Sequence, residues 1–133
     1  MDSLENNMNN ESNIFSKYII KISKDKTYYG RLNDPTCAAY VKGACGDEME
    51  YYLVIEDEKI VDVRFWTTGC VSSQACGILL AKKIINKDIY EALDISPAFL
   101  LKDLKDLPKE YHHCSILACL TLYKAIGEYF ITE

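Results

Sequence analysis

The sequence lacks several features that would assign it to a common class. It has no Cys-x-x-Cys pair, although 6 of its 133 residues are cysteine, so zinc ribbons and thioredoxin-type redox sites lose their usual support. It has no block of Lys and Arg suited to a phosphate backbone, and its net charge is −5. We therefore expect no nucleic acid as partner.

Long apolar stretches and a targeting signal are also missing. A membrane-spanning helix needs a run of about 18 or more apolar residues, and no such run occurs. The first five residues, Met-Asp-Ser-Leu-Glu, form neither a basic nor a hydrophobic signal region. We expect a cytoplasmic protein without a membrane partner, whose cysteines stay reduced and therefore bind metal, carry sulfur or pack in the core.

The composition along the chain predicts a short polar N-terminal tail followed by one domain. Residues 1–13 are rich in Asn, Ser and Glu, which predicts a disordered N-terminal tail. Residues 14–133 are predicted to form a single domain, because a chain of this length with 49% apolar residues can bury a core of its own.

Hydrophobic periodicity divides this domain into strands and helices. Apolar residues alternate with polar ones in two segments on either side of a charged turn at 56–59, which predicts a β-hairpin. The core face of its second strand is predicted to carry Val61, Val63 and Phe65. A less certain third strand covers 38–42.

Helical spacing predicts the remaining elements. The expected helices are a short one from Ile14 that ends before Gly30, one from about 70 to 86, one or two within 88–106, and one over 115–130. The apolar stripe of the last helix is predicted to contain Ile116, Leu117, Leu120, Tyr123 and Phe130. Strands that cluster before helices predict an α+β fold, in which a small antiparallel three-stranded meander carries helices packed on one face.

Three of the cysteines fall at element ends. Cys45 stands in Gly43-Ala44-Cys45-Gly46-Asp47, where an extended chain would point the side chains of Cys45 and Asp47 to the same side. Cys70 and Cys114 stand at predicted helix starts, where unpaired N–H groups favour thiolate and predict accessible, nucleophilic sulfur. By contrast, Cys76 and Cys119 lie inside helices and are predicted to be core residues, and Cys37 is predicted to be structural and half-exposed.

The order and spacing of three motifs resemble a known family. Cys45-Gly46-Asp47-Glu48-Met49, Phe65-Trp66-Thr67-Thr68-Gly69-Cys70 and His113-Cys114-Ser115-Ile116-Leu117-Ala118 are similar to the motifs of iron–sulfur cluster assembly scaffolds of the IscU and NifU N-terminal type. The resemblance implies that Cys45, Cys70 and Cys114 converge on a transient [2Fe–2S] cluster, with Asp47 or His113 completing the ligand set. Zn²⁺ suits the same ligands.

The resemblance also implies partners. A cysteine desulfurase would deliver persulfide sulfur to Cys114, and apo iron–sulfur proteins would receive the cluster. The segment Leu107-Pro108-Lys109-Glu110-Tyr111 departs from the Leu-Pro-Pro-x-Lys pattern of many relatives. That departure argues against release by an Hsp70-type chaperone.

Other functions remain open at this point. The second hypothesis is a zinc-binding persulfide carrier that works with a cysteine desulfurase and never holds a cluster. A purely structural zinc domain would unfold without metal. A hydrolase or transferase that uses Cys114 and His113 is disfavoured, since adjacent residues rarely align a thiol with its base.

Overall fold

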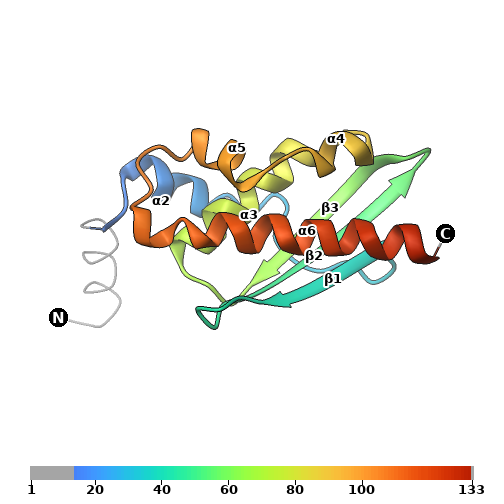
Figure 1. Ribbon diagram of the computed structural model, residues 1–133, viewed down its shortest axis with the longest axis horizontal. Coiled ribbons are helices and arrows are strands. Elements are labelled where there is room, and N and C mark those ends of the chain that lie inside the picture. The colour runs from blue at the N-terminus through green and yellow to red at the C-terminus, as the bar shows by residue number, and fades with distance from the viewer. Residues whose placement is uncertain (1–13, 133) are drawn as a thin grey trace.

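The computed structural model describes residues 14–132, which form three strands and a set of helices (Figure 1). The predicted disordered tail, 1–13, lies outside the described residues. In chain order the elements are α2 (Lys17–Ser23), β1 (Cys37–Lys42), β2 (Glu48–Glu56), β3 (Lys59–Thr67), α3 (Val71–Ile84), α4 (Ile89–Leu93), α5 (Pro97–Lys102), the 3₁₀ helix η1 (Lys109–Tyr111) and α6 (His113–Thr132). The predicted α+β class and three-stranded meander are confirmed.

The sheet is an antiparallel meander in the order β1-β2-β3. A two-residue turn joins β2 to β3, and both of its residues, Asp57 and Glu58, have positive φ. The register shifts at Val54 and Ile55, so that Ile55 pairs with Ile60. This bulge corrects the predicted core face: Ile60 is buried, whereas Val61 is 39% exposed.

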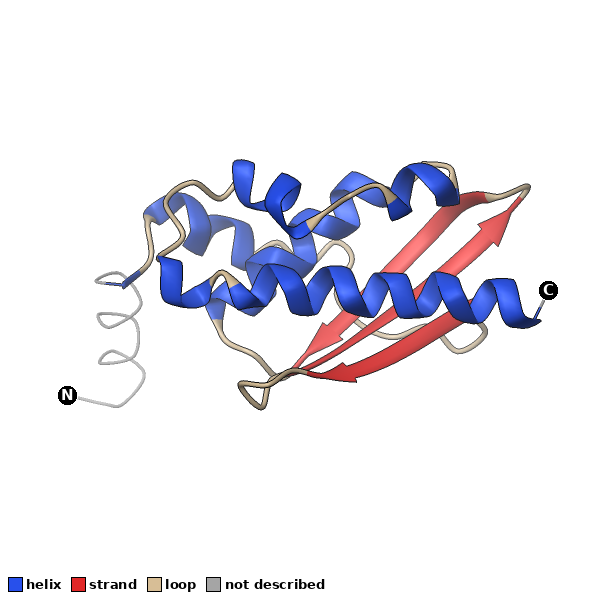
Figure 2. Ribbon diagram, viewed as in Figure 1, coloured by secondary structure: helices blue, strands red, loops and turns tan. Residues whose placement is uncertain are grey.

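Helices cover one face of the sheet in two layers (Figure 2). α3 packs against β3, and α6 packs against β1 and β2. The shorter helices α2, α4 and α5 contact these two long helices from outside. The layer between sheet and long helices is the apolar core, into which β2 points Met49, Tyr51, Leu53 and Ile55.

α3 comes unusually close to β3 because it carries a glycine at the contact. A Cβ atom built on Gly77 would lie 2.6 Å from the ring of Phe65. The hydroxyl of buried Tyr51 donates to the carbonyl oxygen of Gly77 over 2.6 Å. These contacts hold the first half of α3, and therefore its N-terminal turn, in a defined position on the sheet.

α6 is apolar on more than one side, and its buried face differs from the predicted stripe. Leu117, Leu122 and Ile126 are buried, whereas Ile116 and Leu120 are 48% and 50% exposed. The stretch 109–132 is long and apolar enough to cross a membrane by length and composition, and half of its most apolar window is buried inside the fold. The core helix of a globular domain has these same properties.

Candidate functional site

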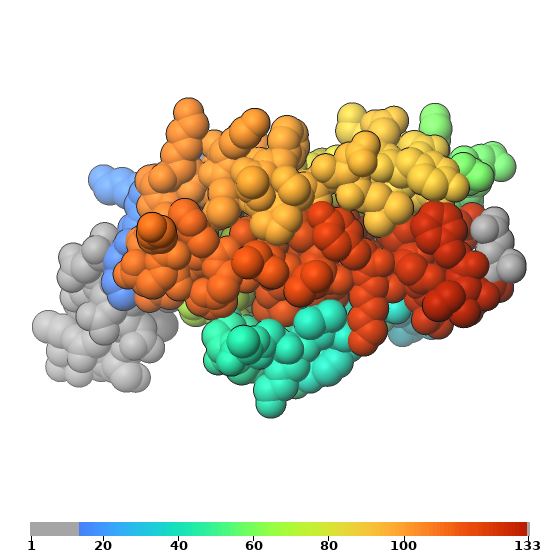
Figure 3. Space-filling view, in the orientation of Figure 1, coloured from blue at the N-terminus to red at the C-terminus, as the bar shows by residue number. Residues whose placement is uncertain are grey.

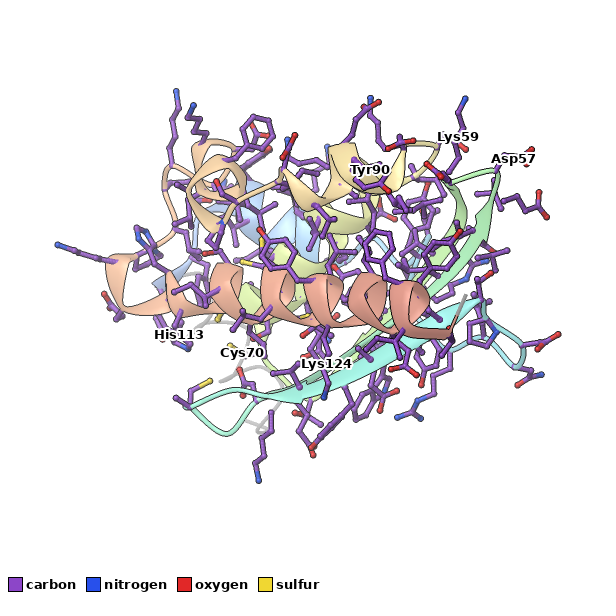
Figure 4. The ribbon with its side chains drawn as sticks, turned by 45° about the vertical axis from the view of Figure 1, so that its right-hand side comes forward. Asp57, Lys59, Cys70, Tyr90, His113 and Lys124 are labelled. Atoms are coloured by element: carbon purple, nitrogen blue, oxygen red, sulfur yellow. The ribbon has the colours of Figure 1, made fainter. Side chains whose placement is uncertain are left out.

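Cys70 occupies the N-cap position of α3 and is exposed. Its side chain makes no capping hydrogen bond, so the sulfur is left for other contacts. It lies 3.6 Å from the hydroxyl of Ser72 in the first turn of the helix. Figure 4 shows Cys70 and His113 at the same end of the molecule, opposite the end where Asp57 of the β2–β3 turn and Lys59 at the start of β3 lie.

Cys114 is the second residue of α6 and is only 1% exposed. Its Sγ lies 3.0 Å from Ser72 Oγ and 3.4 Å from Ser73 Oγ, both in the first turn of α3. Burial raises the pKa of the Cys114 thiol, and hydrogen bonds from the two serines oppose that rise. The prediction of an accessible thiolate at this position was therefore wrong: desolvation outweighs the effect of the helix start.

Asp47 reaches Cys114 through Ser73. The Ser73 hydroxyl donates to Asp47 Oδ2 over 2.9 Å while its oxygen stays 3.4 Å from Cys114 Sγ. A hydroxyl has a single proton, so Ser73 cannot donate to the carboxylate and to a thiolate at the same time. Asp47 thus competes with Cys114 for this proton.

Gly69 makes the approach of these groups possible. A Cβ atom at this position would lie 2.3 Å from Ser73 Oγ and 2.8 Å from Asp47 Oδ2. The backbone N–H of Gly69 donates to Thr67 Oγ1 over 3.0 Å, which fixes the bend from β3 into α3.

Cys45 lies in a turn, so the shared orientation that an extended chain would give the side chains of Cys45 and Asp47 does not apply. Gly43 N–H donates to Asp47 O over 2.8 Å, and Gly46, with φ of +94°, donates to Gly43 O over 3.0 Å. The turn leaves Cys45 exposed and turns Asp47 toward α3. Cys45 and Asp47 consequently do not share a face.

A groove of about 540 Å³ lies between this turn, β1 and α6. Cys45 and His113 line it together with apolar residues that include Val41, Ile116 and Leu120. In the space-filling view, atoms of β1 and of the β1–β2 turn run as a strip along α6 (Figure 3).

The two histidines have different surroundings. His113 is exposed, and its Nε2 lies 3.7 Å from Cys114 Sγ. His112 is half-buried, with Nε2 3.0 Å from the carbonyl oxygen of Leu107. Only His113 is therefore placed to join Cys114 in binding a ligand.

The predicted ligands gather at one end of the fold without forming a finished metal site. Cys70, Asp47 and His113 each connect to Cys114, directly or through a serine. Within residues 14–132, however, no three His, Cys, Asp or Glu side chains are arranged to hold a metal ion. The ligand set Cys45, Asp47, Cys70, His113 and Cys114 remains a prediction.

Sequence reasoning missed Ser72 and Ser73. Both are fully buried, although serine is usually exposed. A signal was present, because two hydroxyl residues follow directly after the first apolar position of a helix that begins at a cysteine. That pattern places both hydroxyls beside the helix start, where buried polar groups need partners.

The remaining cysteines are buried free thiols. Cys76 and Cys119 are fully buried, as predicted for core residues. Cys37 begins β1 and is 4% exposed, which corrects the expectation of a half-exposed residue. Burial, with the charge of Glu128, raises the pKa of Cys37 to about 11.

Fold and site together define a small α+β domain that gathers thiols, a carboxylate and an imidazole at one end. The chain belongs to the family described as NifU-like N terminal domain, whose model matches residues 14–133. The resemblance noted from the three motifs is thereby confirmed.

Named relatives are similar over most of this chain. The iron–sulfur cluster assembly scaffold protein IscU of Thermotoga maritima is 30% identical over an alignment of 132 residues, covering 85% of this chain and 92% of the relative. IscU of Escherichia coli is 36% identical, covering 73% and 77%. IscU 1 of Archaeoglobus fulgidus is 38% identical over 65% of this chain, and the match spans 56% of that relative's length.

Solved structures have the same fold. One is described as a scaffold protein for the SUF system from Fervidobacterium islandicum, with a TM-score of 0.72 and 28% identity over 85% of this chain and 96% of that one. The N-terminal NifU-like protein of Brucella abortus has a TM-score of 0.72 over 92% of this chain and 98% of that one, at 18% identity.

Proposed function

We propose that this protein is a scaffold on which a transient iron–sulfur cluster is assembled from iron and desulfurase-derived sulfur, and from which the cluster passes to apo-proteins. The observation that carries the proposal is the convergence on Cys114 of side chains from three separate segments. Cys70 and Asp47 reach it through the serines of α3, and His113 contacts it directly. Iron–sulfur clusters are held by thiolates, and family relatives carry the scaffold name.

The proposed ligands are Cys45, Cys70 and Cys114, with Asp47 or His113 as the fourth. A carboxylate or imidazole bonds iron more weakly than a thiolate and is more easily protonated, which suits a cluster that must leave. Cys45 stands on a glycine-rich turn and lines the same groove as His113, and movement of this turn is proposed to bring Cys45 to the other ligands. The cluster is cargo in this proposal, and a [2Fe–2S] type fits the number of ligands.

Sulfur is proposed to arrive as a persulfide from a cysteine desulfurase, with Cys114 as the acceptor. Its buried position beside two hydroxyls protects a persulfide from water while Ser72 stabilises the anionic sulfur. The protein itself turns over no small molecule in this proposal. The Leu107-Pro108-Lys109 segment gives no support for an Hsp70-type chaperone as a partner.

Anaerobic reconstitution with iron, a desulfurase and cysteine tests the proposal. The expected result is a visible chromophore with acid-labile sulfide, lost in the Cys45→Ser, Cys70→Ser and Cys114→Ser variants. Cys37→Ser is the matched control, because that buried thiol lies at the start of β1 and should leave the chromophore intact. A chromophore indifferent to all three site variants overturns the scaffold, and tight zinc without sulfide supports the carrier instead.

Asp47 is proposed to set the lifetime of the cluster. Asp47→Ala removes a weak, exchangeable ligand and leaves the Ser73 proton free to support sulfur. The cluster is therefore expected to persist longer and to transfer more slowly to an apo-ferredoxin, followed by its absorbance. Transfer at the parental rate contradicts this role.

A further inference from the structure

A second buried thiol lies behind Cys114, on the neighbouring helix. Cys76 follows Ser73 by three positions and Ser72 by four, so all three share one face of α3. The two serines contact Cys114 Sγ at 3.4 and 3.0 Å. Cys76 therefore stands one helical turn below the groups that touch Cys114, on the side that faces α6.

The surroundings of Cys76 agree with this placement. Cys76 is fully buried, and burial raises its pKa well above the ordinary value, with the Cys114 sulfur as the leading charged neighbour. Because the thiolate is the reactive form, the raised pKa and burial make Cys76 a slow nucleophile toward dissolved reagents, and only a sulfur held beside it at high effective concentration can react with it. Cys114 is the sulfur that the geometry places there.

Cys119 offers a comparison on the same helix as Cys114. It is equally buried, but it follows Cys114 by five positions. Helix geometry separates such Cα atoms by about 8–9 Å, which is too far for a disulfide. Cys119 instead interacts with Tyr123 one turn further along α6. Of Cys76 and Cys119, only Cys76 stands on a different helix from Cys114.

We propose that Cys76 is an internal resolving thiol that releases sulfide from a persulfide held on Cys114. The proposal rests on the proposed function in one respect, namely that sulfur arrives at Cys114 as a persulfide. Cys76 Sγ attacks Cys114 Sγ, the bond between Cys114 Sγ and its outer sulfur breaks, and a Cys76–Cys114 disulfide forms.

The electrons and atoms of this step balance without an external reductant. The outer sulfur of the persulfide takes the electron pair of the broken bond and leaves as hydrosulfide, while the two cysteine sulfurs are oxidised to one disulfide. The proton of the Cys76 thiol leaves with the sulfide. A dithiol reductant then returns both cysteines to thiols by exchange before the next cycle.

In the test, Cys114 of the full chain is converted once to the persulfide, without metal or added reductant, and the loss of this persulfide is followed over time. Cys70→Ser serves as the background, because Cys70 is the competing thiol nearest to Ser72 and Cys114. Cys76→Ser and Cys119→Ser are added to it separately. The serine introduced at 76 donates to the carbonyl of residue 72 within the helix, and Cys76→Ala is a second variant that introduces no polar group.

Peptide mass spectrometry and sulfide release report the outcome after desulfurase and free cysteine are removed. We expect the background and its Cys119→Ser form to release one sulfide per disulfide and to yield a linked Cys76–Cys114 peptide. Both Cys76 variants should keep the persulfide at least about tenfold longer. Equal decay with and without Cys76, or a linked peptide without Cys76, overturns the inference.

Chemical labelling of Cys114 distinguishes failure of this inference from failure of the proposed function. Failure of a desulfurase to place sulfur on Cys114 counts against the scaffold, so Cys114 is also loaded as a mixed disulfide with thionitrobenzoate, in a Cys45→Ser/Cys70→Ser chain. Cys76 should displace the coloured thionitrobenzoate and form the same linked peptide. Retention of the label for as long as in the Cys76→Ser form overturns the resolving role, whatever the desulfurase does.

Discussion

The reactivity of each thiol depends on a few neighbouring atoms. Cys70 is the N-cap residue of α3 and Cys114 is the second residue of α6, so both lie at helix starts. Cys70 is exposed, whereas Cys114 is buried and desolvation raises its pKa. A place at a helix start therefore does not by itself predict a reactive thiol, because burial opposes the charged form.

Ser72 is predicted to be the main donor to the Cys114 thiolate, since Ser73 gives its proton to Asp47. Ser72→Ala should raise the pKa of Cys114 further and slow its alkylation at pH 8 by about tenfold, because a hydrogen bond to a charged group is lost. Because the pKa is already raised, alkylation of the parent should also accelerate as the pH rises above 8. Peptide mass spectrometry with iodoacetamide measures both.

The control for this prediction is Ser115→Ala. Ser115 is as buried as Ser72 and adjoins Cys114, yet its hydroxyl donates to His112 O. Its removal should leave the alkylation rate of Cys114 unchanged, with Cys70 as the internal reference. Equal slowing in both serine variants would mean that general loosening of the site, rather than the hydrogen bond, sets the reactivity.

The cysteines at element ends could be identified from sequence, but their surroundings could not. Exposure of Cys114 depends on how α3 packs beside α6, which no local pattern encodes. Likewise the glycine spacing around Cys45 does not reveal that Gly46 has positive φ or that the turn directs Asp47 toward α3. Motif order predicted that residues far apart in the sequence lie together at one end of the fold, and tertiary packing decided what each of them contacts.

Among the elements, the bend from β3 into α3 is the tightest part of the site. Gly69→Ala would push a methyl group against Ser73 and Asp47, at 2.3 and 2.8 Å. We expect a loss of about 1–3 kcal/mol in unfolding free energy, measured by urea denaturation. Faster alkylation of Cys114 should accompany it, because the displaced first turn opens the thiol to solvent.

Gly127→Ala is the matched control for that substitution. Gly127 lies within α6, and a Cβ atom there meets nothing within 4 Å. Alanine should stabilise the helix by up to about 1 kcal/mol. Destabilisation by both substitutions would refute the steric explanation for Gly69.

The buried face of α6 gives a second prediction at this scale. Leu122 is fully buried and Leu120 is half-exposed. Leu122→Ala should cost about 2–5 kcal/mol of unfolding free energy, and Leu120→Ala less than about 1 kcal/mol. Urea unfolding of both variants measures the difference, and similar costs would contradict the orientation of the helix.

The positions of helices and strands in the sequence were easier to predict than which of their faces is buried. The alternation on either side of the charged turn at 56–59 predicted the hairpin that β2 and β3 form. The prediction of the buried face of α6 was partly wrong because apolar residues surround the helix. Its pattern alone therefore cannot distinguish the side that faces the core from the side that faces the groove. Val61 was misplaced for a different reason, since a bulge shifts the alternation without changing the sequence pattern.

For the whole molecule, most of the apolar core lies outside the thiol site, although buried Cys114 belongs to both. The fully buried side chains of the sheet face, including Met49, Leu53 and Ile60, stabilise the fold without any metal ligand among them. A structural zinc domain behaves differently, because metal binding supplies its folding energy.

A strong chelator should therefore leave the protein folded. We expect the protein to keep its circular dichroism spectrum and a cooperative thermal transition after treatment with excess chelator and removal of metal. A bound cluster or zinc ion, when present, should raise Tm by an amount that grows with the logarithm of its affinity. Unfolding on chelation would support the structural zinc alternative and contradict the scaffold.

The contact between α3 and α6 also bears on how the chain folds during synthesis. Cys114 meets Ser72 and Ser73 only after the last helix of the fold has docked, more than forty positions after the serines are made. Contacts of such sequence separation form late, since the loop between them must close first. A nascent or truncated chain that ends before α6 carries Cys45 and Cys70 but lacks Cys114, so the thiol site is assembled only when folding is complete.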